Sequence, residues 1–390
     1  MRKLKYALSQ FLSIIYLFLL KKLKTDHNAV LVNKSKTEIN IGYYDLPASS
    51  LNDSFTAFTE RVNMRTSSAI DKTDICIVDE EFKNKRVLTE TFVWNSQLGS
   101  RLMWSTVCEK TLFYLDIEND NIITKEIDVV NGEIKTYPFQ AFCLDLEDKG
   151  FYGLNYSRLF KSRPGYGYIK ESLSSTLSND GLLYYSISNR KGHVIATYEE
   201  LFKLVDVSPK ELVDIRLNHL QLNYDGSKLI FLLRYQKDED DFSHMIILNT
   251  NEGVLSVLPF GPHISHACWM SNDKIVLWAK HSENKDPAFY LYNIEIDTAT
   301  KLGINKDGHP FKIDENKFIC DTYNNSARQR ELFTYNLENH TKIHLGKFYT
   351  GIKYSGSSRC DLHPRINRKR DKFIIDVSYT GKRNIAYGEI

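Results

Sequence analysis

The sequence lacks most features of secreted, nucleotide-binding or serine-hydrolase proteins. Its six cysteines form no C-x-x-C pair, and several lie in apolar runs such as ICIV and FICD, as buried thiols do in a reducing compartment. It contains no G-x-x-x-x-G-K loop, no G-x-S-x-G elbow and no Asp-box repeat. These absences argue against nucleotide-sugar transfer, serine hydrolysis and sialidase activity, and the free thiols favour the cytoplasm.

Charge of one sign and linker composition are also missing. The 51 basic and 49 acidic residues leave a net charge of +2, so no global field favours nucleic acid as a partner. No Pro/Gly/Ser-rich stretch divides the 390 residues, which favours one large repeat domain. The chain is instead rich in aromatic residues, with 23 Tyr and 21 Phe, as expected of a folded β-rich protein.

Long hydrophobic runs are scarce, and the main one lies near the N-terminus, from Ala7 to Leu20. It is shorter than the roughly 20 residues that a membrane-spanning helix needs, and no small-x-small cleavage site follows it. Lysines flank it on both sides. We therefore predict that residues 1–24 form a short helix in peripheral contact with the inner membrane, with an uncleaved signal-like anchor or a soluble packed helix as alternatives. Residues 25–37 are predicted to be a linker.

Four histidines recur at one position of four successive repeats: His219, His266, His309 and His363. In each repeat a polar turn follows the histidine, and a strand-like apolar triplet comes next. The histidines are about 43 to 54 residues apart, which is the size of a propeller blade. Their register therefore predicts consecutive blades of a β-propeller.

Seven such units can be marked over residues 38–390, beginning near Glu38, Thr91, Ala141, Lys210, Pro262, Ile304 and Gly351. The prediction is an all-β, seven-bladed β-propeller, with six or eight blades as alternatives because the first three units are irregular. One helix is expected at residues 198–205. The last unit lacks a fourth strand, and we expect an early strand around residues 38–43 to close the ring.

Equivalent positions on the inner strands of adjacent blades face the central channel, so the four histidines should converge there. Neutral imidazoles bind Zn, Mn, Fe or Ni. We therefore predict a divalent metal, Mn or Zn, held by His219, His266, His309 and His363. The alternative is that these histidines only form hydrogen bonds between blades.

Arginines and tyrosines accompany these positions. Guanidinium groups bind carboxylates in a bidentate manner and tyrosine rings stack on sugars, so both predict an acidic oligosaccharide or polysaccharide as ligand. Arg216 and Arg365 are catalytic candidates that would neutralise a substrate carboxylate, and Tyr168 is a candidate base. The predicted substrate-binding residues are Arg158, Arg163, Tyr166, Arg328, Arg359, Tyr44 and Asp45. Salt bridges to Asp321, Asp361 or Asp376 are the alternative for the arginines, and the segment NYSRLFKSRPGYGY is interpreted as a loop that either binds glycan or packs for structural reasons.

The last four units resemble the oligogalacturonate lyase family, through NHLQLNYDG at His219, SHACWMSND at His266, and CDLHPRI with FIIDVSYTGKRNIAY at His363. Members of that family are seven-bladed propellers that bind a divalent metal, typically Mn, and cleave uronate oligosaccharides by β-elimination. The resemblance implies His219, His266 and His363 as metal ligands and gives His309 no counterpart. Cys360 stands where the family has a glutamine ligand, and a ligating thiol would favour a softer ion such as Zn.

The motifs GYYDLP, NSQLGSRLMW, NYSRLFKSRPGYGY and RCDLHPRI also resemble uncharacterised propellers of bacterial surface-polysaccharide gene clusters. The leading hypothesis is therefore a metal-dependent lyase that acts on an acidic glycan in surface-polysaccharide metabolism. One alternative is a non-catalytic propeller that binds glycan or scaffolds glycosyltransferases at the inner membrane. Another is a glycoside hydrolase that uses Asp321 or Asp376.

Overall fold

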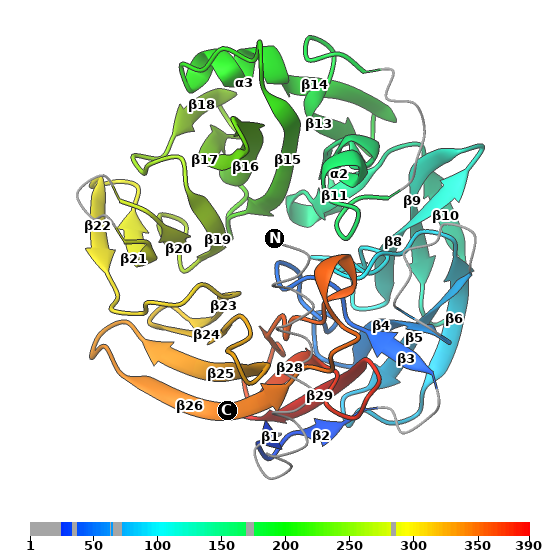
Figure 1. The fold of residues 1–390 in the computed structure, drawn as a ribbon. Coiled ribbons are helices and arrows are strands. Elements are labelled where there is room, and N and C mark those ends of the chain that lie inside the picture. Colours follow the sequence, from blue (N-terminus) through cyan, green and yellow to red (C-terminus); the bar gives the residue numbers. More distant parts are fainter. Residues whose placement is uncertain (1–24, 33–36, 63, 65–71, 169–174, 282–285) are drawn as a thin grey trace.

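Seven antiparallel sheets surround a central axis in a computed structural model of the chain (Figure 1). The structure describes residues 25–32, 37–62, 64, 72–168, 175–281 and 286–390. The predicted helix at residues 1–24 lies outside them. Each of the seven units expected from the repeats forms one sheet, so the predicted seven-bladed propeller is confirmed.

The blades are numbered along the chain, and the strands of each blade are named in order from the axis outward. Blade 1 contains β3 (Glu38–Asn40), β4 (Phe55–Arg61), β5 (Thr73–Asp79) and β6 (Arg86–Thr91). Blade 2 contains β7 (Met103–Trp104), β8 (Thr111–Glu118), β9 (Asn121–Asp128) and β10 (Ile134–Tyr137). Blade 3 contains β11 (Ala141–Leu144), β12 (Gly150–Gly153), β13 (Gly181–Ser186) and β14 (Lys191–Thr197).

Blade 4 contains β15 (Val213–Leu222), β16 (Lys228–Lys237), β17 (Asp240–Asn249) and β18 (Val254–Val257). Blade 5 contains β19 (Ile264–Trp269), β20 (Lys274–Ala279), β21 (Ala288–Asn293) and β22 (Thr298–Lys301). Blade 6 contains β23 (Phe311–Asp314), β24 (Lys317–Asp321), β25 (Gln329–Asn336), β26 (Lys342–Tyr349) and β1 (Thr25–Asp26). Blade 7 contains β27 (Arg365–Ile366), β28 (Lys372–Val377), β29 (Asn384–Glu389) and β2 (Val30–Leu31).

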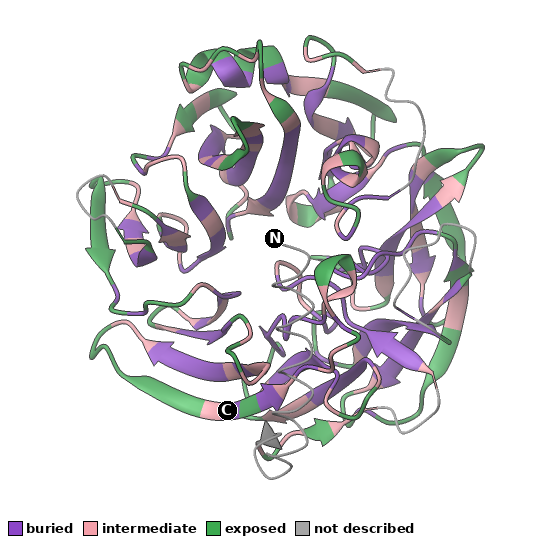
Figure 2. Ribbon diagram, viewed as in Figure 1, coloured by how far each residue is buried: buried purple, intermediate pink, exposed green. Residues whose placement is uncertain are grey.

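The hydrophobic core lies between neighbouring blades. Along β16, Leu229, Phe231 and Leu233 pack in the cluster shared with blade 3. The intervening Ile230 and Leu232 pack in the cluster shared with blade 5. Because successive side chains of a strand point to opposite faces, a strand between two blades reads as a continuous apolar run. Figure 2 shows the same pattern around the ring, with buried strands near the axis and exposed strands at the rim.

The N-terminal segment closes the ring. Val30 and Leu31 in β2 pair with β29 as the outermost strand of blade 7, and β1 adds a fifth strand to blade 6. The expectation that residues 38–43 would close blade 7 was wrong, because β3 is the innermost strand of blade 1. The segment predicted as a linker instead supplies the closing strands, since a short polar segment can pair with an open sheet edge.

Two α-helices and two 3-10 turns occur among the described residues. The helix expected at residues 198–205 is α3 (Tyr198–Leu204), which begins with a capping box between Thr197 and Glu200. A second helix, α2 (Tyr156–Ser162), forms where a loop was predicted, and Asn155 caps it. The turns are η1 (Leu146–Asp148) and η2 (Gly356–Ser358). No helix in the described part of the chain is long and apolar enough to cross a membrane.

Asp376 on β28 fastens blade 7 to blade 1. Its carboxylate accepts hydrogen bonds from the Ile41 backbone N–H and the Asn40 amide, each at 3.1 Å. Burial raises the pKa of this carboxyl to about 7, although Arg383 and Arg365 oppose the shift. Because the folded-state pKa exceeds the usual unfolded value of about 4, the folded protein holds this proton over a range in which the unfolded chain does not. The free energy of unfolding should therefore decrease as pH rises from about 4 to about 7.

We expect Asp376→Asn to remove that contribution, which is on the order of 4 kcal/mol at most. The measurement is urea unfolding of wild type and variant from pH 4.5 to pH 8. Wild type should lose stability relative to the Asp376→Asn variant as pH rises. A constant difference would show that this carboxyl does not titrate over the range.

Candidate metal-binding site at the propeller axis

The structure brings the four predicted histidines together, on or just before the innermost strands of blades 4 to 7. His219 lies in β15 and His266 in β19, whereas His309 and His363 immediately precede β23 and β27. The centroids of neighbouring rings are 5.5, 4.4 and 4.6 Å apart around the axis. All four side chains are at most 4 % exposed.

Backbone irregularities aim these rings at the axis. The pairing of β15 with β16 shifts register between Asn218 and Gln221, on either side of His219. The pairing of β19 with β20 shifts between Ile264 and Ala267, around His266. His219 has a φ of 56° and His363 a φ of 45°, in the left-handed region that side chains other than glycine rarely occupy. Bulges and strained backbone of this kind re-aim side chains and cluster at functional sites.

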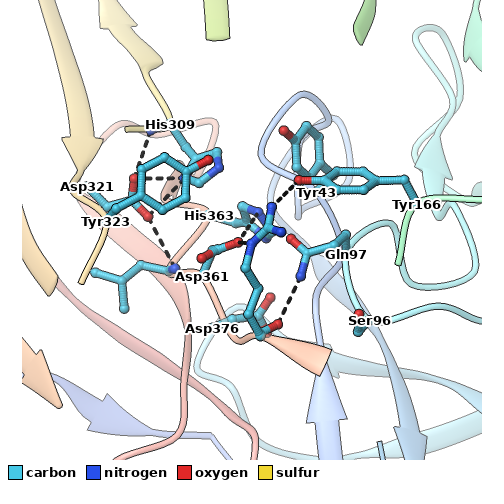
Figure 3. Close-up of polar contacts among 12 residues, drawn as sticks. Tyr43, Ser96, Gln97, Tyr166, His309, Asp321, Tyr323, Asp361, His363 and Asp376 are labelled. Carbon is cyan, nitrogen blue, oxygen red and sulfur yellow. Dashed lines mark hydrogen bonds and ion pairs between the residues drawn. The ribbon is translucent and has the colours of Figure 1, made fainter. Parts of the chain in front are cut away.

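Three of the buried side chains form a group that could hold a metal ion: His309, Asp361 and His363. One ligand atom from each lies within 4.8 Å of the others. Nε2 of His309 and both ring nitrogens of His363 have no hydrogen-bond partner in the described protein. Figure 3 shows His309 and His363 directed toward the same space, with Asp361 below them. Two imidazoles and a carboxylate suit Mn, Fe or Zn.

Carboxylates behind the histidines orient two of the rings. Asp321, at the end of β24, accepts from Nδ1 of His309 at 2.9 Å, and Asp307 is 2.9 Å from Nδ1 of His266. A proton on Nδ1 satisfies each contact and leaves the Nε2 lone pair free for a metal or a substrate proton. The close approach of the His309 loop to β24 requires Gly308, because a Cβ there would lie 1.9 Å from the Asp321 carbonyl oxygen.

The local electrostatics give His363 and Asp361 the protonation states that metal ligands need. Burial lowers the pKa of His363 well below its usual value, and the neighbouring His309 lowers it further. Burial raises the pKa of Asp361, but Arg359 and Arg330 outweigh it and hold the carboxyl well below its ordinary range. Neutral imidazole and ionised carboxylate are the forms that bind metals.

Tyr43 and Tyr44, from the loop after β3, lie among the four histidine side chains. The Tyr43 ring lies 4.7 Å from His363 and 5.2 Å from His219, centroid to centroid. The Tyr44 hydroxyl, predicted to bind substrate, donates to the Ala267 carbonyl at 3.1 Å. Asp45 also stood among the predicted substrate ligands, but it is fully buried in an ion pair with Arg101. Tyr44 and Asp45 therefore build the wall of the site.

Several other predicted site residues are engaged in structural bonds. Arg365 donates to the carbonyls of Ile41 and Tyr43, and the Tyr168 hydroxyl donates to the Gly99 carbonyl at 2.9 Å. Burial also raises the pKa of Tyr168 well above its usual value, which disfavours its use as a base. Further bonds of this kind join Arg158 to Asp180 at 2.7 Å and Arg328 to the carbonyls of Thr350, Gly351 and Tyr354.

Arg359 and Tyr166 contact each other beside the group of His309, Asp361 and His363. Arg359 donates to the Tyr166 hydroxyl, and its Nε lies 2.5 Å from Asp361 Oδ2. The second ion pair of Asp361 is with Arg330, at 2.7 Å. At Asp361 these arginines therefore form the salt bridges that were the alternative to substrate binding.

Cys360 lies outside the three-residue group, and burial raises the pKa of its thiol to about 12, so it stays protonated.

A cluster of three arginines lies beside His219, formed by Arg163, Arg216 and Arg234. Arg163 and Arg216 share a single carboxylate, Asp241, at 3.4 and 3.9 Å. Arg216 is only 2 % exposed, and burial together with the other two arginines lowers its pKa to about 10. Nε of Arg216 and Nε of Arg234 have no partner in the described protein. Such a cluster has spare capacity for an anionic ligand.

Sequence reasoning did not assign Asp361, Asp307 and Asp321 to the metal site. Asp307 and Asp361 each stand two residues before a repeat histidine, so the pattern D-x-H was a usable signal. The pairing is unexpected, since Asp307 orients His266 of the neighbouring blade and not His309. Asp321 carried no such signal, because its contact with His309 depends on the β23–β24 hairpin.

We expect Asp321→Asn to weaken metal binding by about 10- to 100-fold, as substitutions behind a metal ligand typically do. Oδ1 of Asp321 accepts from the backbone N–H and Nδ1 of His309 at 2.8 and 2.9 Å, and Oδ2 accepts from the Leu362 N–H at 3.2 Å. An amide has one acceptor oxygen and no charge, so it cannot satisfy all three donors as the carboxylate does. Titration of the metal-free variant with Mn²⁺ in a calorimeter checks this. Unchanged affinity would mean that His309 is not a ligand or needs no orientation by Asp321.

Neither a protein-family model nor a curated protein sequence matches this chain. Among solved structures, an oligogalacturonate lyase in complex with manganese is similar with a TM-score of 0.69 and 14 % identity, over 94 % of this chain and 97 % of that one. The oligogalacturonate lyase of Vibrio parahaemolyticus has a TM-score of 0.66 and 12 % identity over the same shares. The propeller domain of the Trilobed protease from Pyrococcus furiosus follows at 0.52 and 8 %, over 90 % and 95 %. The chain therefore shares the seven-bladed propeller fold of the oligogalacturonate lyases.

Proposed function

We propose that this protein is a metal-dependent lyase that cleaves an acidic, uronate-containing glycan by β-elimination at the propeller axis, in bacterial surface-polysaccharide metabolism. The observation that carries the proposal is the buried group of His309, Asp361 and His363, whose unbonded ring nitrogens have no hydrogen-bond partner in the described part of the chain. Imidazole nitrogens left unbonded in a protein interior are costly unless a ligand binds them.

His309, His363 and Asp361 would hold the metal, and the His266 ring lies 4.4 Å from the His309 ring, centroid to centroid. A divalent ion bound there would supply a positive charge that stabilises the enolate formed when a uronate loses its C5 proton. Two imidazoles and one carboxylate suit Mn, and the protonated Cys360 thiol adds no soft ligand that would select Zn.

The arginine cluster of Arg163, Arg216 and Arg234 supports an acidic substrate. Two of its guanidinium groups have a free Nε, and one exposed carboxylate is shared between Arg163 and Arg216. A uronate carboxylate bound there would replace Asp241 as the partner of Arg163 and Arg216. The matching manganese-bound neighbour is named an oligogalacturonate lyase, which is consistent with an acidic oligosaccharide.

His219 is the imidazole best suited to act as base. It lies three residues from Arg216 on β15, and its Nδ1 has no hydrogen-bond partner among the described residues. Burial and the nearby Arg234 lower its pKa well below the usual value, so the ring is neutral and able to accept a proton. In the proposed step His219 takes the C5 proton, the C–H electrons form the C4–C5 double bond, and the glycosidic C4–O bond breaks. The leaving oxygen then takes up a proton.

A non-catalytic glycan-binding propeller is the second candidate. It is favoured by the two arginines that already neutralise Asp361, because a carboxylate with two such partners can be a purely structural centre. In that case the histidines would only pack between blades. This candidate predicts no stoichiometric metal, and it predicts glycan binding without cleavage.

Cleavage and metal content separate the two candidates. Purified protein with Mn²⁺ should generate ultraviolet absorbance from the C4–C5 double bond on a panel of uronate-containing oligosaccharides. His219→Gln should abolish this signal while the protein keeps its metal, whereas His363→Ala should lose both. Stoichiometric metal absent from wild type, together with no absorbance change on any uronate glycan, would refute the lyase proposal.

A further inference from the structure

Basic and aromatic side chains of blades 4, 6 and 7 lie close together around the β15–β16 and β27–β28 turns. Tyr224 lies in the turn between β15 and β16, and the residue as a whole is 53 % exposed. Its hydroxyl donates to the Trp269 carbonyl of blade 5 at 2.8 Å. The Lys312 ammonium of blade 6 lies 4.0 Å from the ring centroid. Arg368 and Arg370, in the β27–β28 turn of blade 7, are near enough to lower the pKa of Tyr224, although burial raises it more.

We propose that this surface is a second carbohydrate-binding site, separate from the histidine site, which binds an acidic sugar unit of a glycan through Tyr224, Lys312 and Arg370. Binding at this surface does not depend on catalysis at the axis, because it uses groups that the proposed lyase reaction does not use.

The three cations have spare binding capacity. No carboxylate lies within ion-pair distance of Lys312, Arg368 or Arg370 in the described part of the chain. Burial lowers the pKa of Lys312 and repulsion from the nearby Arg370 lowers it further, although Glu315 and Asp314 oppose the shift. The neighbouring Asp53 is occupied by the backbone N–H groups of residues 368 and 369, at 2.7 and 2.6 Å. An anionic ligand would relieve this repulsion.

A cavity of about 550 Å³ adjoins these groups and has a mixed lining. Lys312 and Arg370 supply positive charge, while Asp314, Glu315 and Glu338 supply hydrogen-bond acceptors. Such acceptors suit sugar hydroxyls, the cations suit an acid group, and the exposed tyrosine ring suits a pyranose face. A bare phosphate would use only the cations, so the lining favours an acidic sugar over a simple anion.

Packed side chains separate this surface from the histidines. The Gln221 amide donates to the Ala267 carbonyl at 3.0 Å, and the Trp269 indole N–H donates to the Gln221 carbonyl at 3.0 Å. Tyr44 bonds to the same Ala267 carbonyl at 3.1 Å from the histidine side. A sugar on Tyr224 therefore cannot reach the proposed metal group, and the two sites bind independently.

The test titrates a fluorescently labelled oligogalacturonate into the full chain in the presence of EDTA, so that metal-dependent cleavage plays no part. We expect Tyr224→Ala, and the double variant Lys312→Gln with Arg370→Asn, each to weaken binding at least tenfold. Tyr224→Phe keeps the ring and should bind within about twofold of wild type. Lys301→Gln, which changes an exposed lysine on the rim strand β22, is the matched control and should bind as wild type does.

If Tyr224→Ala fails to fold, Arg370→Asn still tests the site. Position 370 is exposed, and asparagine tolerates its φ of 63°, so this substitution should not disturb folding. The proposal would be overturned if Tyr224→Ala and the double variant bound the oligogalacturonate as tightly as wild type does. It would also be overturned if wild type bound a neutral maltooligosaccharide with equal affinity. Displacement by inorganic phosphate without any effect of Tyr224→Ala would identify a simple anion site and would also refute it. Binding only to phosphatidylglycerol vesicles would do the same. Failure of the lyase proposal leaves every one of these measurements interpretable.

Discussion

Replacing His309 by alanine is expected to abolish stoichiometric metal binding and, with it, cleavage of acidic glycans. His309 supplies Nε2 to the group with Asp361 and His363, and Asp321 holds the ring in place. Loss of a direct ligand should lower metal affinity by more than the 10- to 100-fold that a substitution behind a ligand costs. Elemental analysis of the purified proteins, followed by Mn²⁺ titration, measures the effect.

Thermal unfolding gives a second readout of the same variant. A metal that binds only the folded protein adds about 2.7 kcal/mol of stability at a concentration 100 times its dissociation constant. Mn²⁺ should therefore raise the unfolding temperature of wild type but not of His309→Ala. His193→Ala, on the exposed face of β14, is the matched control and should behave as wild type. Full metal occupancy in His309→Ala would contradict the assignment.

Replacing Arg101 by methionine is expected to destabilise the protein by about 3–5 kcal/mol, the cost of leaving a buried partner charge unpaired. Arg101 and Asp45 are both fully buried, and two N–H groups of Arg101 donate to the two carboxylate oxygens at 2.8 and 2.7 Å. The Arg101 Nε also donates to the Phe142 carbonyl at 2.6 Å, and the guanidinium stacks on the Phe142 ring. This network joins the loops of blades 1, 2 and 3 at the axis.

The same variant should weaken metal binding although Arg101 touches no proposed ligand. Asp45 follows Tyr43 and Tyr44, whose rings pack against the histidines, so release of Asp45 loosens the packing of the site. Urea unfolding and Mn²⁺ titration measure the two effects. Lys83→Ala removes an exposed ion pair with Glu81 and should change neither quantity. A double variant, Arg101→Met with Asp45→Leu, should recover part of the stability, because no buried charge is then unpaired. Equal stability of Arg101→Met and wild type would contradict this account.

The fold could be predicted because blade repeats leave local signals. The apolar triplets after each histidine, such as Leu229-Ile230-Phe231, became second strands buried on both faces, and the polar hairpin turns became the outer edges. Ring closure could not be predicted in this way. The closing strand Val30–Leu31 is only two residues long, and the edge of β29, not its own sequence, makes it a strand. The helix α2 was missed for a similar reason, since Asn155 and the buried Tyr156 and Leu159 act only once blade 3 is assembled.

The repeats in the sequence were enough to favour seven blades and to predict the convergence of His219, His266, His309 and His363, because a repeat register maps onto equivalent inner strands. The residues that accompany these histidines could be identified only from the three-dimensional contacts. The tertiary structure placed Asp361 beside His309 and His363, sequestered Asp45 and Tyr168 in structural bonds, and left Cys360 outside the group. The physical reason is that these contacts join residues of different blades or hairpins. Their geometry is set by bulges, left-handed backbone and buried ion pairs, which carry no periodic signal in the sequence.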